Sequence, residues 1–252
     1  MKDIKFIAPK IYIDNFDERP IPSLNHLPDW YKKLKHHPNR TTIKGCRPFM
    51  DSMTTGYILT TPQEYYIEIT TLEDGNLQIY VRSSFVEFSG DPKFKDININ
   101  TDMGKSSHPP FQLEGSPQLE KNFNFPAMKF CNPWRIQTPP GYSCLFTPPL
   151  NRVDERFEII NGVVDTDIYK EYINFPFFLK KDYLLKNVKD GKFFSIIEKG
   201  TPYCQIIPFK RESWRMKIKG KTTKQITREQ FGFSLKLLHK YKSLYWNKKS
   251  WK

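Results

Sequence analysis

The sequence predicts a mainly β protein, built as one sandwich-like domain with a short helix near the N-terminus and a basic helix at the C-terminus. Its 20 prolines, against 12 glycines, recur at short intervals and interrupt helices repeatedly. The runs between them are rich in β-branched and aromatic residues, as strands are. Hydrophobic residues make up 38% of the chain and aromatic residues 15%, enough for a sizeable core. A chain of 252 residues is within the range of a single all-β domain.

Six runs of alternating or apolar residues are expected to be strands. They cover residues 56–61, 65–70, 77–88, 135–138, 193–199 and 203–209. Asp74 and Gly75 lie between the second and third of these runs, and this pair favours the positive φ of a tight turn. We therefore expect a β-hairpin there. Residues 89–126, rich in Gly, Pro, Asn and Ser, are expected to form a long loop or excursion.

The first predicted helix covers residues 30–37. Asp29 can cap it, and Trp30 and Leu34 are four residues apart on the face expected to dock on the sheet.

The second predicted helix begins at a capping box formed by Thr227 and Gln230, and Phe231, Leu235 and Leu238 give it an apolar stripe. The expected organisation is a mainly β domain at 1–226 and a basic amphipathic helix and tail packed on it at 227–252.

Positive charge is concentrated at the C-terminus. Residues 209–252 hold 14 Lys or Arg and two Glu, a net +12, whereas the rest of the chain carries +1 of the total +13. Lysines alternate there with Tyr and Trp, which suits stacking on bases and neutralising phosphates. The alternative is a docked amphipathic helix with solvated lysines. The candidate surface for an anionic partner consists of Lys236, Lys240, Lys248 and Lys249.

The remaining composition argues against several classes of protein. No apolar run is long enough for a membrane span, and the N-terminus is not that of a signal peptide. The four cysteines are widely spaced, so we expect reduced thiols rather than disulfides, and no histidine has metal-ligand spacing, so we assign no metal site. Neither a G-x-S-x-G nucleophile elbow nor a glycine-rich phosphate loop occurs.

Residues 139–209 contain the PPGYS segment, GVVD at 162–165, and Lys199-Gly200 followed by QII at 205–207. In this order the motifs resemble the β-clip core of dUTPases and dCTP deaminases. It implies a β-clip as the specific form of the fold. It also implies that Asp165 is a water-orienting catalytic base, although Asp165 and Asp167 flank Thr166 in a predicted hairpin and equally suit a turn.

The chain departs from that family at the phosphate-binding motif. Where those enzymes carry Arg-Ser-Ser, this sequence has Pro148 through Asn151, and Arg152 is the nearest cation. One inserted residue shifts Tyr169 relative to the pocket tyrosine of the family, which in a strand moves a side chain to the other face. The candidate ligand-binding residues are Arg152, Tyr169, Asn174 and Gln205, with Lys210 and Arg211 as further cations.

The whole chain also resembles an uncharacterised protein family of tailed phages and some bacteria. The shared blocks are IKGCRPFMDSMTTGYIL, PPGYSCLFTPP, GVVDTD, INFPF and IPFKRE. The resemblance implies a phage source, and with it a place in the host cytoplasm or in the virion.

Two hypotheses of function follow. In the first, the protein is a non-enzymatic β module that acts by association, as a virion component or as a binder of a host factor or ligand, and self-associates as a closed oligomer such as a trimer. In the second, it is a dUTPase-like nucleotide-binding protein or pyrophosphatase, a Mg²⁺-dependent nucleoside triphosphate hydrolase. We favour the first, which needs no cofactor, because no catalytic motif is evident.

Overall fold

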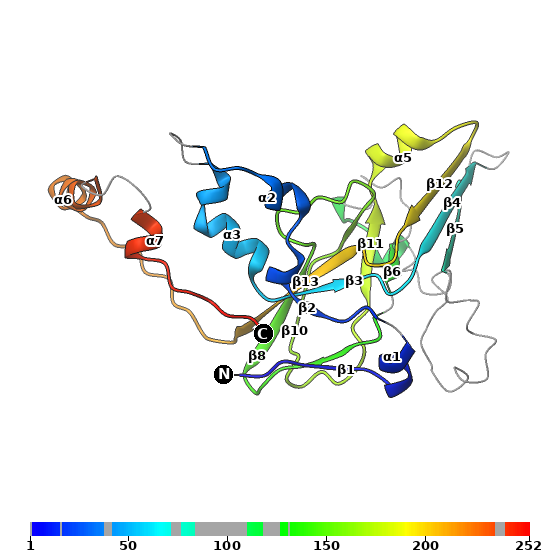
Figure 1. The fold of residues 1–252 in the computed structure, drawn as a ribbon, viewed down its shortest axis with the longest axis horizontal. Helices are drawn as coiled ribbons and strands as arrows, with labels where there is room; N and C mark the ends of the chain where they lie inside the picture. Colours follow the sequence, from blue (N-terminus) through cyan, green and yellow to red (C-terminus); the bar gives the residue numbers. More distant parts are fainter. Residues whose placement is uncertain are drawn as a thin grey trace.

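The fold is mainly β, as the sequence predicts. In a computed structural model, residues 2–15, 17–37, 42–71, 77–83, 110–117, 127–130, 132–234 and 240–252 are described. Within them, thirteen strands form four antiparallel sheets, and the helices are short (Figure 1). Most of the predicted loop at 89–126 lies outside these residues.

The largest sheet has five strands and is built around β13. Its order is β10 (Gly162–Val164), β8 (Tyr142–Thr147), β13 (Pro202–Lys210), β3 (Tyr57–Thr60) and β2 (Ile21–Pro22). Ile206 of β13 pairs with Phe146 on one side and with Tyr57 on the other. Among the described strands β10 pairs with β8 alone, so the predicted hairpin around Asp165 and Asp167 is wrong. The strand is followed there by a turn, in which Tyr169 N donates to Asp165 O at 2.9 Å.

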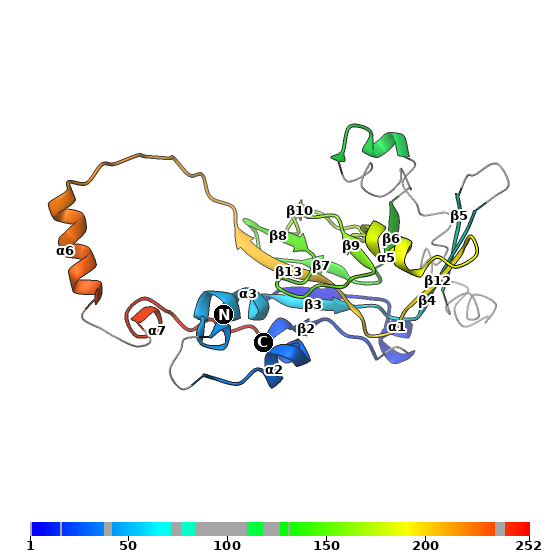
Figure 2. The same cartoon turned by 90° about the horizontal axis from the view of Figure 1, so that it is seen from above.

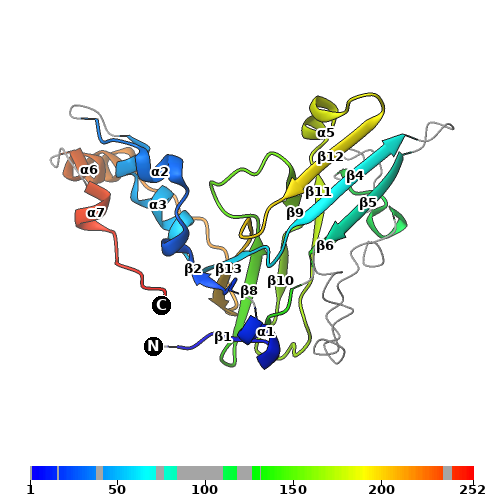
Figure 3. The ribbon, with the colours of Figure 1, turned by 45° about the vertical axis from the view of Figure 1, so that its right-hand side comes forward.

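Three smaller sheets complete the β structure. They are β6 (Met128–Phe130), β11 (Phe175–Leu179) and β9 (Phe157–Ile159); β12 (Lys192–Ile197), β4 (Tyr65–Thr71) and β5 (Leu77–Ser83); and β1 (Lys5–Ile7) with β7 (Arg135–Gln137). The hairpin predicted around Asp74-Gly75 is confirmed, because β4 pairs with β5 from Tyr65↔Ser83 to Thr71↔Leu77. The Asp74-Gly75 turn itself lies outside the described residues. The β12-β4-β5 sheet projects beside α5 (Lys181–Asn187) (Figure 3).

Aromatic rings from several sheets form one core. Phe130 of β6 stacks on Phe177 of β11 with centroids 4.0 Å apart, and Tyr203 of β13 lies 5.0 Å from Phe130. Ile67 of β4 and Phe193 of β12 are buried in the same cluster. Because strands from separate sheets share this core, the β region holds together as one hydrophobic unit.

The other helical segments are short. They are α1 (Lys10–Asn15), η1 (Ser23–His26), α2 (Asp29–Lys33), η2 (Ile43–Gly45), α3 (Arg47–Thr54), η5 (Pro110–Leu113), α6 (Thr223–Ser234) and α7 (Lys240–Leu244). Helix α3 is not among the helices predicted from sequence. Pro48 lies in the first turn, where a helix has no use for its missing N–H.

Helix α2 differs from its prediction in length and in orientation. It begins at Asp29, with Pro28 as the N-cap, and it ends at Lys33. The docked side chain is Tyr31, which is 3% exposed, whereas the side chain of Trp30 is 47% exposed. Tyr31 is buried because it packs near Phe49 of α3, with ring centroids 6.2 Å apart.

The C-terminal segment leaves the sheets as a long excursion. From the end of β13 the chain runs extended to α6, turns through α7 and returns toward α3 and the N-terminus (Figure 1, Figure 2). Helix α6 begins at Thr223 and not at Thr227, because the capping box is formed by Thr222 and Gln225, whose Oε1 accepts from Thr222 N at 2.9 Å. The described side chains of α6 are exposed, and packing of this helix on the β domain stays a prediction.

Three of the four cysteines lie within the described residues. Cys46, Cys144 and Cys204 are free, and the last two are buried. Cys131 lies outside the described residues. Burial raises the pKa of the Cys144 thiol to about 11.

Among the described helices none has the length and apolar character needed to cross a membrane.

Candidate functional site

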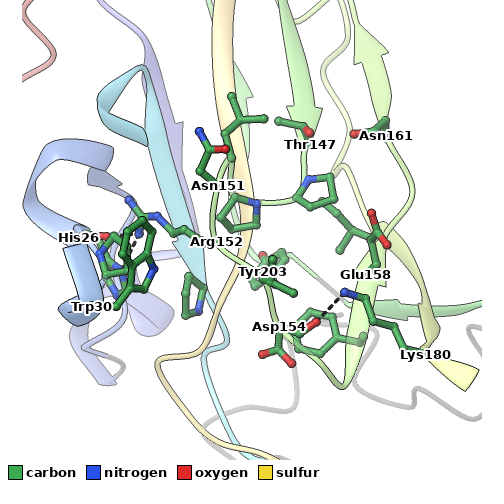
Figure 4. A pocket seen from close by; sticks show the side chains of 18 residues that line it. His26, Trp30, Thr147, Asn151, Arg152, Asp154, Glu158, Asn161, Lys180 and Tyr203 are labelled. Carbon is green, nitrogen blue, oxygen red and sulfur yellow. Dashed lines mark hydrogen bonds between the residues drawn. The ribbon is translucent and has the colours of Figure 1, made fainter. Parts of the chain in front are cut away.

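A cavity of about 590 Å³ opens between the N-terminal helical segment and the end of the large sheet. One wall comes from η1 and α2, and the other from the β8–β9 loop, β9 and the start of β13 (Figure 4). Its lining includes Trp30, Phe157, Tyr203 and the prolines Pro148, Pro149 and Pro202. This volume is in the range of pockets that enclose small organic molecules.

Gln205 holds the β8–β9 loop, which forms part of the cavity wall, in place. This fully buried side chain of β13 accepts from Leu150 N at 2.8 Å and donates to Ser52 O at 2.9 Å and Thr55 O at 2.7 Å. Asn151, at φ 56°, adds a side-chain bond to Ser52 Oγ at 2.6 Å. The amide of Gln205, a predicted ligand-binding group, is thus bonded to the backbone and joins α3 to the loop.

Arg152 joins the two walls of the cavity. Its NH2 donates to Ser23 O at 3.2 Å and Met53 O at 3.1 Å, and its NH1 donates to His26 O and lies 3.0 Å from His26 Nδ1. Its buried Nε has no partner in the described chain. Burial lowers the pKa of this guanidinium to about 10. Arg152 remains a cation at neutral pH, surrounded by carbonyls rather than by carboxylates.

Asp165 belongs to a different cluster, at the start of β8. Ser143 Oγ donates to Asp165 Oδ1 at 2.6 Å, and Arg211 NH1 lies 3.2 Å from the same oxygen. Arg211 NH1 also donates to Asp167 Oδ1 at 2.7 Å, while Gly141 N donates to Asp167 Oδ2 at 2.8 Å. Of the cations considered from sequence, Arg211 therefore meets Asp165, whereas Lys210 pairs with Glu212.

The two clusters lie at opposite ends of the β8–β10 pair. Val164 pairs with Cys144, which places Asp165 at the start of β8, while Gly162 pairs with Phe146, next to Thr147 in the cavity lining. The hollow lined by Asp167 and Tyr169 measures only about 40 Å³. Asp165 and Arg152 therefore do not share a pocket in the described structure.

The other predicted site residues are dispersed. Tyr169 is 44% exposed in the turn after β10, and Asn174 Oδ1 accepts from Asn132 N at 3.4 Å just before β11. The cavity residues missed from sequence, His26, Trp30, Lys180 and Tyr203, occur in four separate segments. The sequence feature that points to this cavity is the polar pair Asn151-Arg152, which closely follows Pro148 and Pro149.

The basic C-terminal surface is partly used within the chain. Lys249 pairs with Asp51 of α3, and Trp246 Nε1 donates to both oxygens of that carboxylate, at 3.1 and 3.0 Å. Trp251 packs edge-on against Tyr57, with centroids 6.1 Å apart. Lys248 is exposed, while Lys236 and the side chain of Lys240 lie outside the described residues. Packing therefore holds this tail against α3 and β3.

No group of three or more potential metal-ligating His, Cys, Asp or Glu residues occurs in the part of the chain that the structure describes. The fold and its sites define a mainly β protein with a cavity large enough for a small molecule and a separate Asp165–Arg211 cluster. No protein-family model and no curated protein matches the chain. Among solved structures, it is similar to a mutant dUTPase of Staphylococcus bacteriophage 80alpha with dUpNHpp, at 11% identity, covering 88% of this chain and 90% of that chain with a TM-score of 0.34. A similarity this distant assigns no activity.

Proposed function

We propose that this protein is a non-enzymatic β module that works by association with further copies of itself through its C-terminal arm, residues 212–221. The observation that carries the proposal is the exposure of three apolar side chains on this arm: Trp214 is 88% exposed, Met216 85% and Ile218 89%. The arm pairs with no strand among the described residues. Exposed apolar patches of this kind mark association surfaces.

The arm has the residue pattern of a strand that lacks a partner. Trp214, Met216 and Ile218 alternate with Arg215, Lys217 and Lys219. In an extended chain, alternate residues point to opposite faces, so one face of the arm is apolar and the other basic. Burying each apolar side chain is worth about 1.5–3 kcal/mol, which a second sheet can supply.

The edge strand β10 is the acceptor that we propose. It ends the five-stranded sheet, so one side of its backbone has no partner strand among the described residues. Val163 on β10 is 61% exposed and Ile168 in the following turn is 68% exposed. Asp165 and Glu171 supply carboxylates in the same stretch. Adding a strand to such an edge combines main-chain hydrogen bonds with side-chain contacts.

We favour pairing of the arm with β10 of a second copy over pairing with β10 of the same chain. Arg211 is fixed by its bond to Gly141 O at 2.9 Å and by its ion pair with Asp167, next to the end of β10. Folding back would need a tight turn directly after Arg211, but the first glycine of the arm is Gly220. The extended arm instead leads away from the sheet (Figure 2). At about 3.3 Å per residue it reaches roughly 33 Å.

When the arm of each copy contacts the edge strand of the next, the contact is heterologous, and it forms a closed ring such as a trimer where the rotation between copies closes. The test pairs Trp214→Arg, which disables the arm, with Val163→Arg, which disables the edge, and measures mass by light scattering against the 29.9 kDa chain. Each variant alone should be monomeric, whereas their mixture should form a dimer from the one intact arm and the one intact edge. Arg215→Ala, on the basic face, is the control and should keep the wild-type mass.

The proposal fails if the wild-type protein is monomeric, or if Trp214→Arg and Val163→Arg leave an oligomer intact. Monomeric single variants that do not form a dimer when mixed would also contradict pairing between the arm and β10.

Arg211 beside Asp165 supports a second candidate, the Mg²⁺-dependent nucleotide enzyme. In that case Asp165 orients water, and Arg211 provides charge for a substrate's phosphates. A deoxynucleoside triphosphate with Mg²⁺ at about 100 times its dissociation constant should then stabilise the protein by roughly 2.7 kcal/mol. A thermal shift that Asp165→Asn abolishes would support the enzyme. No shift with any deoxynucleoside triphosphate tested would contradict this second candidate function.

A further inference from the structure

We propose that the 590 Å³ cavity binds a small organic anion, a molecule with a planar apolar body and a single acidic group. This site is independent of the arm and of the Asp165 cluster.

The apolar body is expected to lie against Trp30. The indole is held in place by edge-to-face contacts with Tyr31 and Phe49, at centroid distances of 5.6 and 6.2 Å, yet it is 47% exposed. Phe157 and Tyr203 also line the cavity, and Tyr203 lies across it from Trp30 (Figure 4). A rigid aromatic surface that is only partly covered favours a planar ligand, because stacking adds to the apolar area that is buried.

The acidic group is expected because neither cation of the lining is paired with a carboxylate among the described residues. No carboxylate of the described residues lies within ion-pair distance of Arg152 or Lys180, and Lys180 Nζ donates to the backbone of Asp154 at 2.7 Å. The carboxylate of Asp154 is held by Arg156, whose NH2 lies 2.8 Å from it. The lining thus holds two cations and two carboxylates, and because Asp154 is engaged by Arg156, Glu158 is the one lining carboxylate without an ion pair among the described residues.

His26 fits the same ligand as a neutral donor. An arginine can only donate, so the 3.0 Å contact between Arg152 NH1 and His26 Nδ1 makes Nδ1 the acceptor. The proton of the neutral ring is then on Nε2, which can donate to an anion. Burial and the neighbouring Arg152 lower the pKa of His26, in agreement with this neutral form.

The test uses two probes with the same type of aromatic body. 1-Anilinonaphthalene-8-sulfonate is an anion, and N-phenyl-1-naphthylamine is its neutral analogue without the sulfonate. Fluorescence titration should give the anion a dissociation constant about tenfold lower than that of the neutral probe, a difference of about 1.4 kcal/mol. Trp30→Ala should weaken both probes, whereas Phe111→Ala, at an exposed aromatic residue outside the cavity lining, should change neither.

Val153 allows the charge to be tested without disturbing Arg152. It lines the cavity, is 81% exposed, and as valine has no polar side-chain atom, so its replacement should leave the fold intact. Val153→Asp should raise the dissociation constant of the anionic probe several-fold and leave that of the neutral probe unchanged, and Val153→Lys should not weaken the anion. Equal affinity for the two probes, or an anion affinity unaffected by Val153→Asp, would overturn the proposal.

Discussion

Arg211 binds Asp167 through both terminal nitrogens, with NH1 donating to Oδ1 at 2.7 Å and NH2 donating to Oδ2. The residues are 44 positions apart, and their contact ties the end of β13 to the turn after β10. This pair fixes the point at which the C-terminal arm leaves the sheet.

The Arg211–Asp167 contact should persist to low pH. Hydrogen bonding to Arg211 lowers the pKa of Asp167 to about 2. Because the folded-state pKa is depressed, the stabilisation is complete above the ordinary Asp pKa and is lost as the pH falls through about 2. Titration of the Asp167 carboxyl carbon by NMR should show this value, and Arg211→Gln should raise it toward about 3.9. An unchanged pKa in that variant would mean that Arg211 is not the cause.

Gln205 should be a major determinant of stability. Gln205→Leu removes three hydrogen bonds that its fully buried side chain makes to the backbone of Leu150, Ser52 and Thr55, which are partly buried. We expect a loss of about 3 kcal/mol in the free energy of unfolding, measured with urea. Gln137→Leu, at an exposed position of β7, is the matched control and should cost under about 0.5 kcal/mol. Similar losses in both variants would contradict the assignment.

Gly56 should tolerate no side chain, whereas Gly200 should. Both have positive φ, at +72° and +81°. A Cβ on Gly56 would lie 1.9 Å from Ile206 O, while one on Gly200 would meet nothing within 4 Å. Gly200→Ala should therefore cost only the backbone strain, about 1–2 kcal/mol. Gly56→Ala must also move β13, so we expect a clearly larger loss in a denaturant titration. Equal losses would be inconsistent with this close approach.

Trp246 should hold the C-terminal tail to α3. Trp246→Phe keeps an aromatic ring but removes the N–H that donates to Asp51. The expected loss is about 1–2 kcal/mol locally, because the acceptor is charged. Limited proteolysis should then cleave the segment before the tail faster than in the wild type, and Trp214→Phe, which keeps an aromatic ring on the exposed arm, should not change that rate. Equal cleavage of Trp246→Phe and wild type would show that the contact does not retain the tail.

Local pattern was sufficient to predict the class of fold. Prolines at short intervals and runs of β-branched and aromatic residues predict short strands, and Asp74-Gly75 predicts the β4–β5 hairpin, because turn chemistry and side-chain alternation act over a few residues. Where local signals had two interpretations, the prediction was wrong. Thr222 and Thr227 are each followed three residues later by a Gln, and the helix begins after the first of these pairs and not after the second.

The sites were decided by tertiary structure. The pairing of β10 with β8, rather than in a hairpin, places Asp165 beside Ser143 and Arg211 and far from Arg152. The cavity brings together η1, α2, the β8–β9 loop and β13, which are remote in sequence. The sequence by itself determined strands, turns and a basic, aromatic tail, since those depend on neighbouring residues. Which side chains meet depends on strand order and on a shared core, which form only when the whole chain packs.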